Sequence, residues 1–211
     1  HRRQRQMCIR DSAWGRDGGN PPEHHTILYF TRLIGGPLDY TPGVFDILIS
    51  STDGAPRLPE ESRVRTTLAK QLALYLVLYS PLQMAADLPE NYEGQPAFQF
   101  IRDVPVDWEF SATLGGRIGD FVVVLRKERD GPDWYLAAIT DEEERSFDIT
   151  LSFLPEGETF VAEIYADGEG AHWLDNPLPI AITEQTVDAA STLTLRLAPG
   201  GGQAIRIRPA G

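Results

Sequence analysis

The C-terminal half of the chain is a series of short apolar segments separated by turn residues, and this pattern constrains the fold most. In the first segment Val106, Trp108 and Phe110 alternate with polar neighbours. The later segments read DFVVVLRK, DWYLAAI, FDITLSF, TFVAEIYAD, TLTLRL and QAIRIR. Short segments spaced roughly 8–12 residues apart are typical of an antiparallel β-sandwich. We therefore predict about seven strands here.

Turn-forming residues stand between these segments. Arg129-Asp130-Gly131-Pro132, Pro155-Glu156-Gly157 and Asp167-Gly168 are such signals. The acidic stretch DEEER, residues 141–145, is predicted to be a solvated hairpin tip rather than a cation site. PGGG, residues 199–202, has neither the lysine nor the following helix of a phosphate-binding loop, so we interpret it as a turn before the last strand.

One helix is predicted upstream, from Val64 to Ser80. Val64, Leu68 and Leu72 recur at helical spacing, and the second half is apolar nearly all round, which indicates deep burial. Pro81 ends the helix because proline lacks an amide hydrogen and clashes with the preceding turn. The following LQMAADLP is expected to add a short helical turn, and the preceding residues 50–63 an exposed loop.

Residues 21–55 contain two apolar runs, HTILYFTRLI and VFDILIS. Runs of this kind that do not alternate are typical of strands buried on both faces, as in α/β folds. Two strands and one helix cannot enclose an α/β core, so the N-terminal part is expected to be truncated. We accordingly expect the apolar face from Leu72 to Leu78 to be exposed, which would favour aggregation.

The first eleven residues, HRRQRQMCIRD, differ from the rest because they are basic in an acidic chain. They have no apolar core and so are not a signal peptide. We interpret them as a non-native leader; the alternative is a basic arm that contacts a partner.

The net charge of -12 and pI near 4.7 argue against nucleic acid or an anionic membrane as a partner. The single cysteine, Cys8, excludes an internal disulfide. The four histidines lack metalloprotease spacing, and no apolar run is long enough to span a membrane.

Four long segments resemble glycoside hydrolase family 97, which comprises α-glucosidases and α-galactosidases. They are NPPEHHTILYFTRLIGGPLDYTPGVFD, TTLAKQLALYLVLYSPLQMAADLPENY, FQFIRDVPVDWE and LAPGGGQAI. The resemblance extends from about Trp14 to Pro209. Family members have an N-terminal β-sandwich, a central (β/α)8 barrel and a C-terminal β-sandwich.

The resemblance implies a domain organisation. Residues 1–11 form the leader, residues 12–96 the C-terminal end of the (β/α)8 barrel, and residues 97–211 the C-terminal β-sandwich. Within the barrel piece, His25 to Leu33 would be the seventh strand. Leu38 to Gly43 would lie at or just after the eighth strand, and Val64 to Ser80 would be the last helix. The fold class is thus a piece of α/β barrel followed by an all-β domain.

The resemblance also implies chemistry. Glycoside hydrolysis requires two carboxylates, and family members hold a calcium ion with glutamates. In the family these residues lie upstream of NPPEHHT, partly in a motif resembling NExxRGxE, and this chain reads CIRDSAWGRDGG at that place. We therefore expect no catalytic residue or metal site here and no activity alone. The implied parent is a calcium-dependent, retaining or inverting, periplasmic enzyme acting on α-glucosides or α-galactosides.

Three residues are candidates for binding the oligosaccharide or α-glycoside substrate: Glu23, His25 and Asp39. Each has a structural alternative, as a solvated turn for Glu23, a strand-end residue for His25, and a turn-stabilising carboxylate for Asp39. Arg32 is expected to be a buried or half-buried ion-pair partner of a barrel acid. The barrel piece would pack against the missing N-terminal part of its own barrel.

The aromatic residues of the sandwich leave a second function open. Trp134, Trp173 and Tyr165 could stack on sugars, although aromatic residues on strands mostly belong to the core. His172 is expected at the surface. The alternatives to a glycosidase fragment are a carbohydrate-binding or barrel-stabilising β-sandwich, and an adaptor without sugar affinity.

Overall fold

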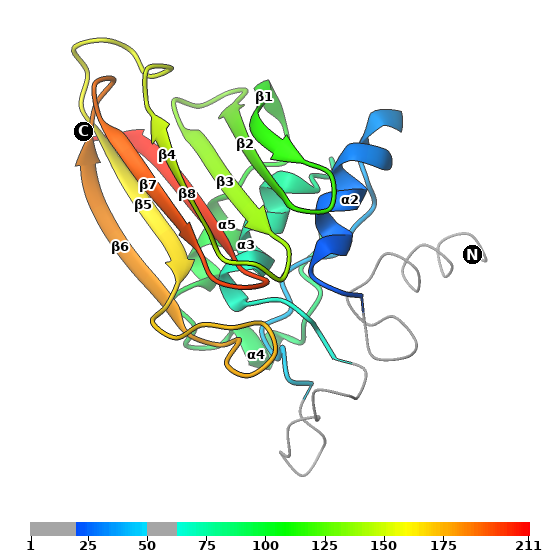
Figure 1. Ribbon diagram of the computed structural model, residues 1–211. Helices are drawn as coiled ribbons and strands as arrows, with labels where there is room; N and C mark the ends of the chain where they lie inside the picture. The colour runs from blue at the N-terminus through cyan, green and yellow to red at the C-terminus, as the bar shows by residue number, and fades with distance from the viewer. Residues whose placement is uncertain (1–19, 50–62) are drawn as a thin grey trace.

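The computed structural model describes residues 20–49 and 63–211, which form three layers. A helical layer covers one face of a six-stranded sheet, and a two-stranded sheet covers the other (Figure 1). The predicted leader and most of the predicted loop at residues 50–63 lie outside the described residues. No helix in the described part is long and apolar enough to cross a membrane.

All strand pairs are antiparallel, as the segment pattern predicts. The larger sheet has the order β1-β2-β3-β8-β5-β6 and the smaller one pairs β4 with β7. The bounds are β1 Trp108–Arg117, β2 Phe121–Glu128, β3 Trp134–Thr140, β4 Arg145–Thr150, β5 Phe160–Asp167, β6 Ile180–Val187, β7 Thr192–Leu197 and β8 Gly202–Pro209. The sequence pattern missed β6, because this edge strand is exposed along most of its length and lacks apolar alternation.

Two details of the strand prediction are wrong. Trp108 is buried, whereas Val106 and Phe110 are 41% and 47% exposed. Val106 lies before β1, and for Phe110 a register irregularity between Trp108 and Phe110 disrupts the expected alternation of faces. The acidic stretch at residues 141–145 is not a hairpin tip. It leads from β3 in the larger sheet to β4 in the smaller sheet, and these two strands do not pair with each other.

The helical layer consists of α2 (Glu23–Thr31), the 3-10 turn η1 (Leu33–Gly35), α3 (Leu68–Val77), α4 (Pro89–Tyr92) and α5 (Phe98–Asp103). The predicted helix at residues 64–80 is therefore present but shorter. It begins after Thr67, whose hydroxyl accepts a hydrogen bond from the amide of Lys70 at 3.2 Å. The helical turn predicted in LQMAADLP is absent, since the Ala86 amide bonds instead to the carbonyl of Pro42 at 3.1 Å.

The segment expected to be the seventh barrel strand, His25 to Leu33, is wrong as a strand. Most of it lies in α2, where the Thr31 hydroxyl donates to the Ile27 carbonyl at 2.7 Å. An apolar run of this length does not distinguish a buried strand from a helix. Here His25 and Leu28 share the buried side at helical spacing.

The segments at Leu38 to Gly43 and in VFDILIS also form no strand. The described residues provide no neighbouring strand for them, and their backbone groups bond to side chains instead.

Two apolar cores lie on either side of the larger sheet. One joins it to β4 and β7, and includes Leu136, Leu195 and Ile205. The other joins it to the helices, with α3 packed mainly on β3 and β8. The residues from Leu72 to Leu78 are at most 3% exposed, so the expected exposed face is wrong. The sheet and a stretch around Tyr40 to Ile47, which belongs to the same core, cover this helix.

Candidate functional site

The predicted sugar contacts do not form a carboxylate pair. Glu23 is exposed in the first turn of α2, and Asp39 is half-buried beside Tyr40. His25 is 1% exposed, and its Nε2 lies 2.7 Å from the Tyr40 hydroxyl. Arg32 is exposed, so its expected burial is wrong, because it follows the last turn of α2 on the solvent side. The contact of these residues with sugar stays a prediction.

The environment of His25 indicates a neutral imidazole. Burial lowers the pKa of His25 well below its ordinary value, and the charges of Lys70 and His24 lower it further. The imidazole and phenol rings of His25 and Tyr40 meet edge to face at 88° with centroids 5.5 Å apart. His25 therefore positions Tyr40 in the helical layer.

We call residues 38–47 the anchored segment, because side chains of other elements hold its backbone. The amides of Gly43 and Val44 donate to Oε1 of Gln71 on α3, at 2.9 and 3.2 Å. The amides of Phe45 and Asp46 both donate to Oδ2 of Asp87, at 2.7 Å. These contacts satisfy buried amides that would otherwise need a strand partner.

Tyr92 completes this anchoring from α4. Its hydroxyl donates to the carbonyl of Gly43 at 2.7 Å and accepts from the amide of Asp87 at 2.9 Å. Burial raises the pKa of Tyr92 to about 12, so the phenol keeps the proton that it donates. The hydroxyl of Tyr75 on α3 donates to the carbonyl of Met84 at 3.1 Å. The anchored segment and α3 thus form one hydrogen-bonded unit.

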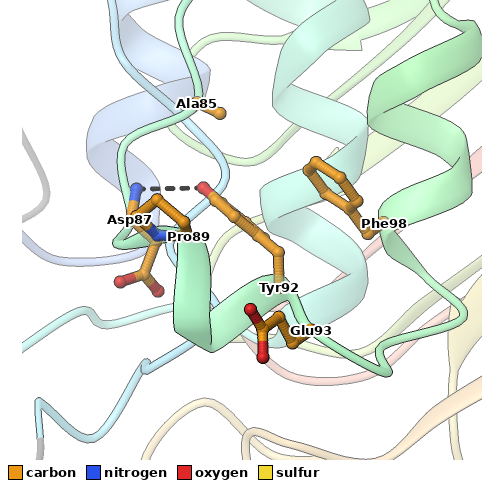
Figure 2. Close-up of a pocket in the computed structure, with 6 residues that line it drawn as sticks. All are labelled: Ala85, Asp87, Pro89, Tyr92, Glu93 and Phe98. Carbon is orange, nitrogen blue, oxygen red and sulfur yellow. Dashed lines mark hydrogen bonds between the residues drawn. The ribbon is translucent and has the colours of Figure 1, made fainter.

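A hollow of ≈ 480 Å³ lies beside this unit, lined by Ala85, Asp87, Pro89, Tyr92, Glu93 and Phe98 (Figure 2). The rings of Tyr92 and Phe98 stack with centroids 4.5 Å apart. The remaining oxygen of Asp87, Oδ1, accepts from the Leu88 amide at 2.8 Å and from Asn91 Nδ2 at 2.6 Å. Each carboxylate oxygen of Asp87 thus already accepts two hydrogen bonds. The role of Asp87 is therefore to hold the backbone of the anchored segment.

A buried lysine joins α3 to the rest of the molecule. Lys70 is 0% exposed, and its Nζ donates to the carbonyls of Pro22 at 2.9 Å and Thr140 at 2.6 Å. One side chain therefore connects α3 with the start of α2 and the end of β3. Burial lowers the pKa of Lys70 to about 7, although Glu142, Asp167 and Asp141 oppose the shift.

Asp167 at the end of β5 is the matching acid, and it is half-buried. Its Oδ2 accepts from the amides of Ala198 at 2.9 Å and Gly202 at 3.0 Å. Burial raises the pKa of Asp167 to about 6, and the Thr67 hydroxyl, these amides and Lys70 counteract the shift. We call Lys70, Asp167 and Gly200–Gly202 the docking cluster.

Glycine is required in the docking cluster because the chains approach closely. A Cβ on Gly201 would lie 2.0 Å from Oδ2 of Asp167, and one on Gly202 would lie 2.8 Å from Cα of Lys70. The predicted turn at Pro199–Gly202 is confirmed. The sequence analysis missed Lys70 and Asp167 as partners. A signal existed, because a lysine within an apolar helix requires buried hydrogen-bond acceptors.

Loops of the sandwich also receive the first turn of α3. The amide of Thr67 donates to the Gly200 carbonyl at 3.2 Å, and the amide of Leu68 donates to the Pro177 carbonyl at 2.9 Å. These bonds satisfy amides that a helix start leaves unpaired. The guanidinium of Arg65 lies 5.8 Å from the ring centroid of Trp173. The sandwich therefore holds the start of the helix through backbone and side chain.

The other aromatic candidates divide between core and surface. Tyr165 is 4% exposed and belongs to the helix-side core. Trp134 is half-buried and packs with Phe153, at a centroid distance of 5.1 Å. His172 is half-buried rather than at the surface, because its Nδ1 accepts from the Leu174 amide at 3.2 Å within a tight loop.

Among residues 20–49 and 63–211, no group of three or more His, Cys, Asp or Glu side chains could hold a metal ion. Two of the acids in this part of the chain serve other partners: Asp87 bonds to amides, and Glu163 pairs with Arg206 and Arg208. The described residues therefore do not form a calcium site by themselves.

The helical layer docked on a β-sandwich is also present within larger solved structures. The chain has the fold of part of a β-arabinopyranosidase, with a TM-score of 0.70 at 24% identity, over 88% of this chain and 27% of that one. Similarity is higher to a glycoside hydrolase family 97 enzyme from Pseudoalteromonas sp. strain K8, solved with panose and with acarbose. There the TM-score is 0.87 at 51% identity, over 92% of this chain and 30% of that one.

Sequence comparisons agree. Residues 107–208 match the family described as "Glycosyl-hydrolase 97 C-terminal, oligomerisation". The chain is 32% identical over 201 residues to the retaining alpha-galactosidase of Bacteroides thetaiotaomicron, which covers 95% of this chain and 29% of that protein. The chain belongs to glycoside hydrolase family 97, and it spans about a third or less of the length of these relatives.

Proposed function

We propose that this chain is the C-terminal part of a family 97 α-glycosidase, whose catalytic carboxylates and calcium ligands lie upstream. The observation that carries the proposal is the docking of α3. Lys70, Asp167 and the glycine turn hold this helix against the sheet, and Gln71 on its other side holds the anchored segment. The chain thus supplies a rigid support for the elements of a barrel wall.

The reaction of the parent follows from its relatives. A retaining glycosidase needs two carboxyl groups about 5 Å apart, one as acid and base and the other as nucleophile. The Bacteroides relative is a retaining alpha-galactosidase, and the Pseudoalteromonas enzyme was solved with panose and acarbose. The substrate of the parent is an α-galactoside or an α-glucoside, cleaved either with retention, as the name of the Bacteroides relative states, or with inversion.

The three predicted substrate contacts take different places in this proposal. Asp39 is the residue that contacts sugar, because it is half-buried next to a fixed tyrosine. His25 is a positioning residue that acts through the hydroxyl of Tyr40. Glu23 is exposed on α2 and would meet substrate only at the margin of the site.

The calcium ion implied by the family belongs to the parent. When bound, such an ion would polarise sugar oxygens near the reacting centre. Among the described residues no group of three or more ligand-type side chains is placed to hold it, so its ligands are assigned to the upstream part of the parent.

The experiment compares the 211-residue chain with the longer protein that contains it, on p-nitrophenyl α-galactoside and α-glucoside. The longer protein should hydrolyse one of them and lose activity in EDTA, whereas the chain alone should be inactive. Within the longer protein, Asp39→Asn should raise KM, and Arg32→Gln on exposed α2 serves as control. Hydrolysis by the purified chain alone would refute the proposal.

The runner-up function is carbohydrate binding without catalysis. The hollow beside Tyr92 favours it, because Phe98 and Glu93 line this surface and could contact a sugar. Calorimetric titration of the chain with maltose and with melibiose tests this alternative. Binding that Phe98→Ala abolishes would support it, and no heat at millimolar sugar would exclude it as a function.

The sheet also has a role in assembly. The matched family is described as an oligomerisation domain, and the match includes β1 to β7 and β8 up to Arg208. Assembly of the parent through this domain is therefore part of the proposed function.

A further inference from the structure

The larger sheet ends in two edge strands, β1 and β6. An edge strand presents unpaired amide and carbonyl groups that can pair with another chain, and most proteins protect such edges with bulges, charges or covering elements. The two edges of this sheet differ in this respect. Their comparison shows which edge is suited to a second chain.

Strand β1 is a protected edge. Its pairing with β2 has two register irregularities, between Trp108 and Phe110 and between Thr113 and Gly115. Helix α2 lies beside it, as Figure 1 shows, and the hydroxyl of Tyr29 bonds to that of Thr113. Bulges and a neighbouring helix both hinder the addition of a further strand.

Strand β6 has none of these protections. It pairs with β5 in unbroken register, from the pair Ile180–Asp167 to the pair Val187–Phe160. It forms the outer border of the sheet in Figure 1. Its sequence, IAITEQTV, contains no proline and no lysine, and residues 181–186 are all exposed. The one charged residue, Glu184, already faces Arg208 at 3.7 Å. By contrast, the smaller sheet carries the charged residues Arg145, Asp148 and Arg196.

We propose that a second copy of this chain pairs antiparallel with β6 and continues the sheet across a two-fold axis centred on Thr183. This inference rests on the proposed assembly role, because the matched family is described as an oligomerisation domain and includes β6. A strand that pairs with its own copy forms a closed dimer, as most soluble oligomers do. Leu178 and Ile182, 45% and 41% exposed, add apolar area at this edge.

Charge and proline select the register. In an antiparallel pair, directly opposed residues face the same side of the sheet. A two-fold axis perpendicular to the sheet therefore passes midway between the two copies of one residue. Centring on Glu184 would oppose two carboxylates, which is unfavourable. Centring on Ile182 would oppose Pro179 to Gln185, and proline cannot donate to the ladder. Centring on Thr183 pairs every residue from Ile180 to Thr186 and opposes two threonines, a favourable pair.

The first experiment maps the register by disulfide trapping of the full chain in a Cys8→Ser background. Oxidation should convert Thr183→Cys into a covalent dimer. The matched control, Ala181→Cys, lies on the same edge, but its two copies would be offset by four residues, about 13 Å along the strand. Crosslinking of Glu184→Cys in preference to Thr183→Cys would overturn the proposed register.

The second experiment measures mass by light scattering over a range of protein concentrations. The unsubstituted chain should be a dimer, Thr183→Lys should be a monomer, and Thr192→Lys on β7 should remain a dimer. A monomeric unsubstituted chain overturns the inference. If Thr183→Lys remains a dimer, the chain assembles through another surface. That result would overturn the pairing through β6 but not the proposed role in assembly. If circular dichroism shows that Thr183→Lys does not fold, the disulfide experiment decides whether β6 pairs with its copy. Hydrolysis by the parent tests the glycosidase proposal independently.

Discussion

Replacement of Lys70 by methionine should change how the stability of this protein depends on pH. Methionine keeps an unbranched apolar side chain but removes the ammonium that donates to the carbonyls of Pro22 and Thr140, at 2.9 and 2.6 Å. Each buried carbonyl left without a donor costs about 1–3 kcal/mol. This loss does not depend on pH, so it lowers the whole stability curve of the variant.

The pH-dependent part has a sign fixed by the direction of the shift. Burial lowers the pKa of Lys70 to about 7, whereas an unfolded lysine has a pKa of about 10.4. Between these values the unfolded chain binds more protons than the folded chain, so stability rises with pH. From the two pKa values, this residue should add about 2 kcal/mol to the free energy of unfolding between pH 7 and pH 9.

Urea unfolding followed by tryptophan fluorescence at pH 7, 8 and 9 measures both effects. Lys70→Met should lack this rise, so its stability relative to the unsubstituted chain should fall by about 2 kcal/mol from pH 7 to pH 9. The matched control is Lys127→Met, since Lys127 is partly exposed and pairs with Glu109 at the surface. Equal pH slopes for the unsubstituted chain and Lys70→Met would refute the reasoning, because they would mean that Lys70 titrates alike in both states.

Two further predictions concern the docking cluster. Gly202→Ala should destabilise the fold by about 1–3 kcal/mol in the same urea assay, because the added Cβ would lie 2.8 Å from Cα of Lys70. Gly35→Ala is the control and should be neutral, because its Cβ would have no atom within 4 Å. The raised pKa of Asp167, about 6, means that folding favours its protonated form, and this contribution is lost as the pH rises from about 4 to 6. Asp167→Asn should therefore flatten the dependence of stability on pH in that window. Asp167→Ala should be less stable than Asp167→Asn, because alanine leaves the amides of Ala198 and Gly202 without an acceptor. Equal stabilities of the two variants would contradict this role of Asp167.

The features predicted correctly from the sequence are mostly local. In DFVVVLRK and TLTLRL, apolar content and alternation identify strands because side-chain direction repeats every two residues. Between Val64 and Ser80, a spacing of three to four between apolar residues identifies the helix, although it begins only after Thr67. Long motifs likewise identified the family, and the candidates His25, Asp39 and Glu23 came from one of them. Their contact with sugar stays a prediction because the described residues hold no partner carboxylate for them.

What only the tertiary structure decided depends on contacts between distant residues. An apolar run such as HTILYFTRLI satisfies a strand and a helix equally, and packing in the helical layer makes most of it α2. Strand β6 has too little buried side chain to show a period, and only its pairing with β5 defines it.

The docking cluster shows the same limit most clearly. Lys70 and Asp167 are 97 positions apart in the numbering, and neither reveals its partner by its neighbours in the chain. By itself the sequence determined seven of the eight strands of the sandwich, the buried helix and the family, because these properties depend on local periodicity and motif. The burial of a charge beside three glycines was decided by the packing of α3 on the sheet, because desolvation depends on every element that surrounds the group.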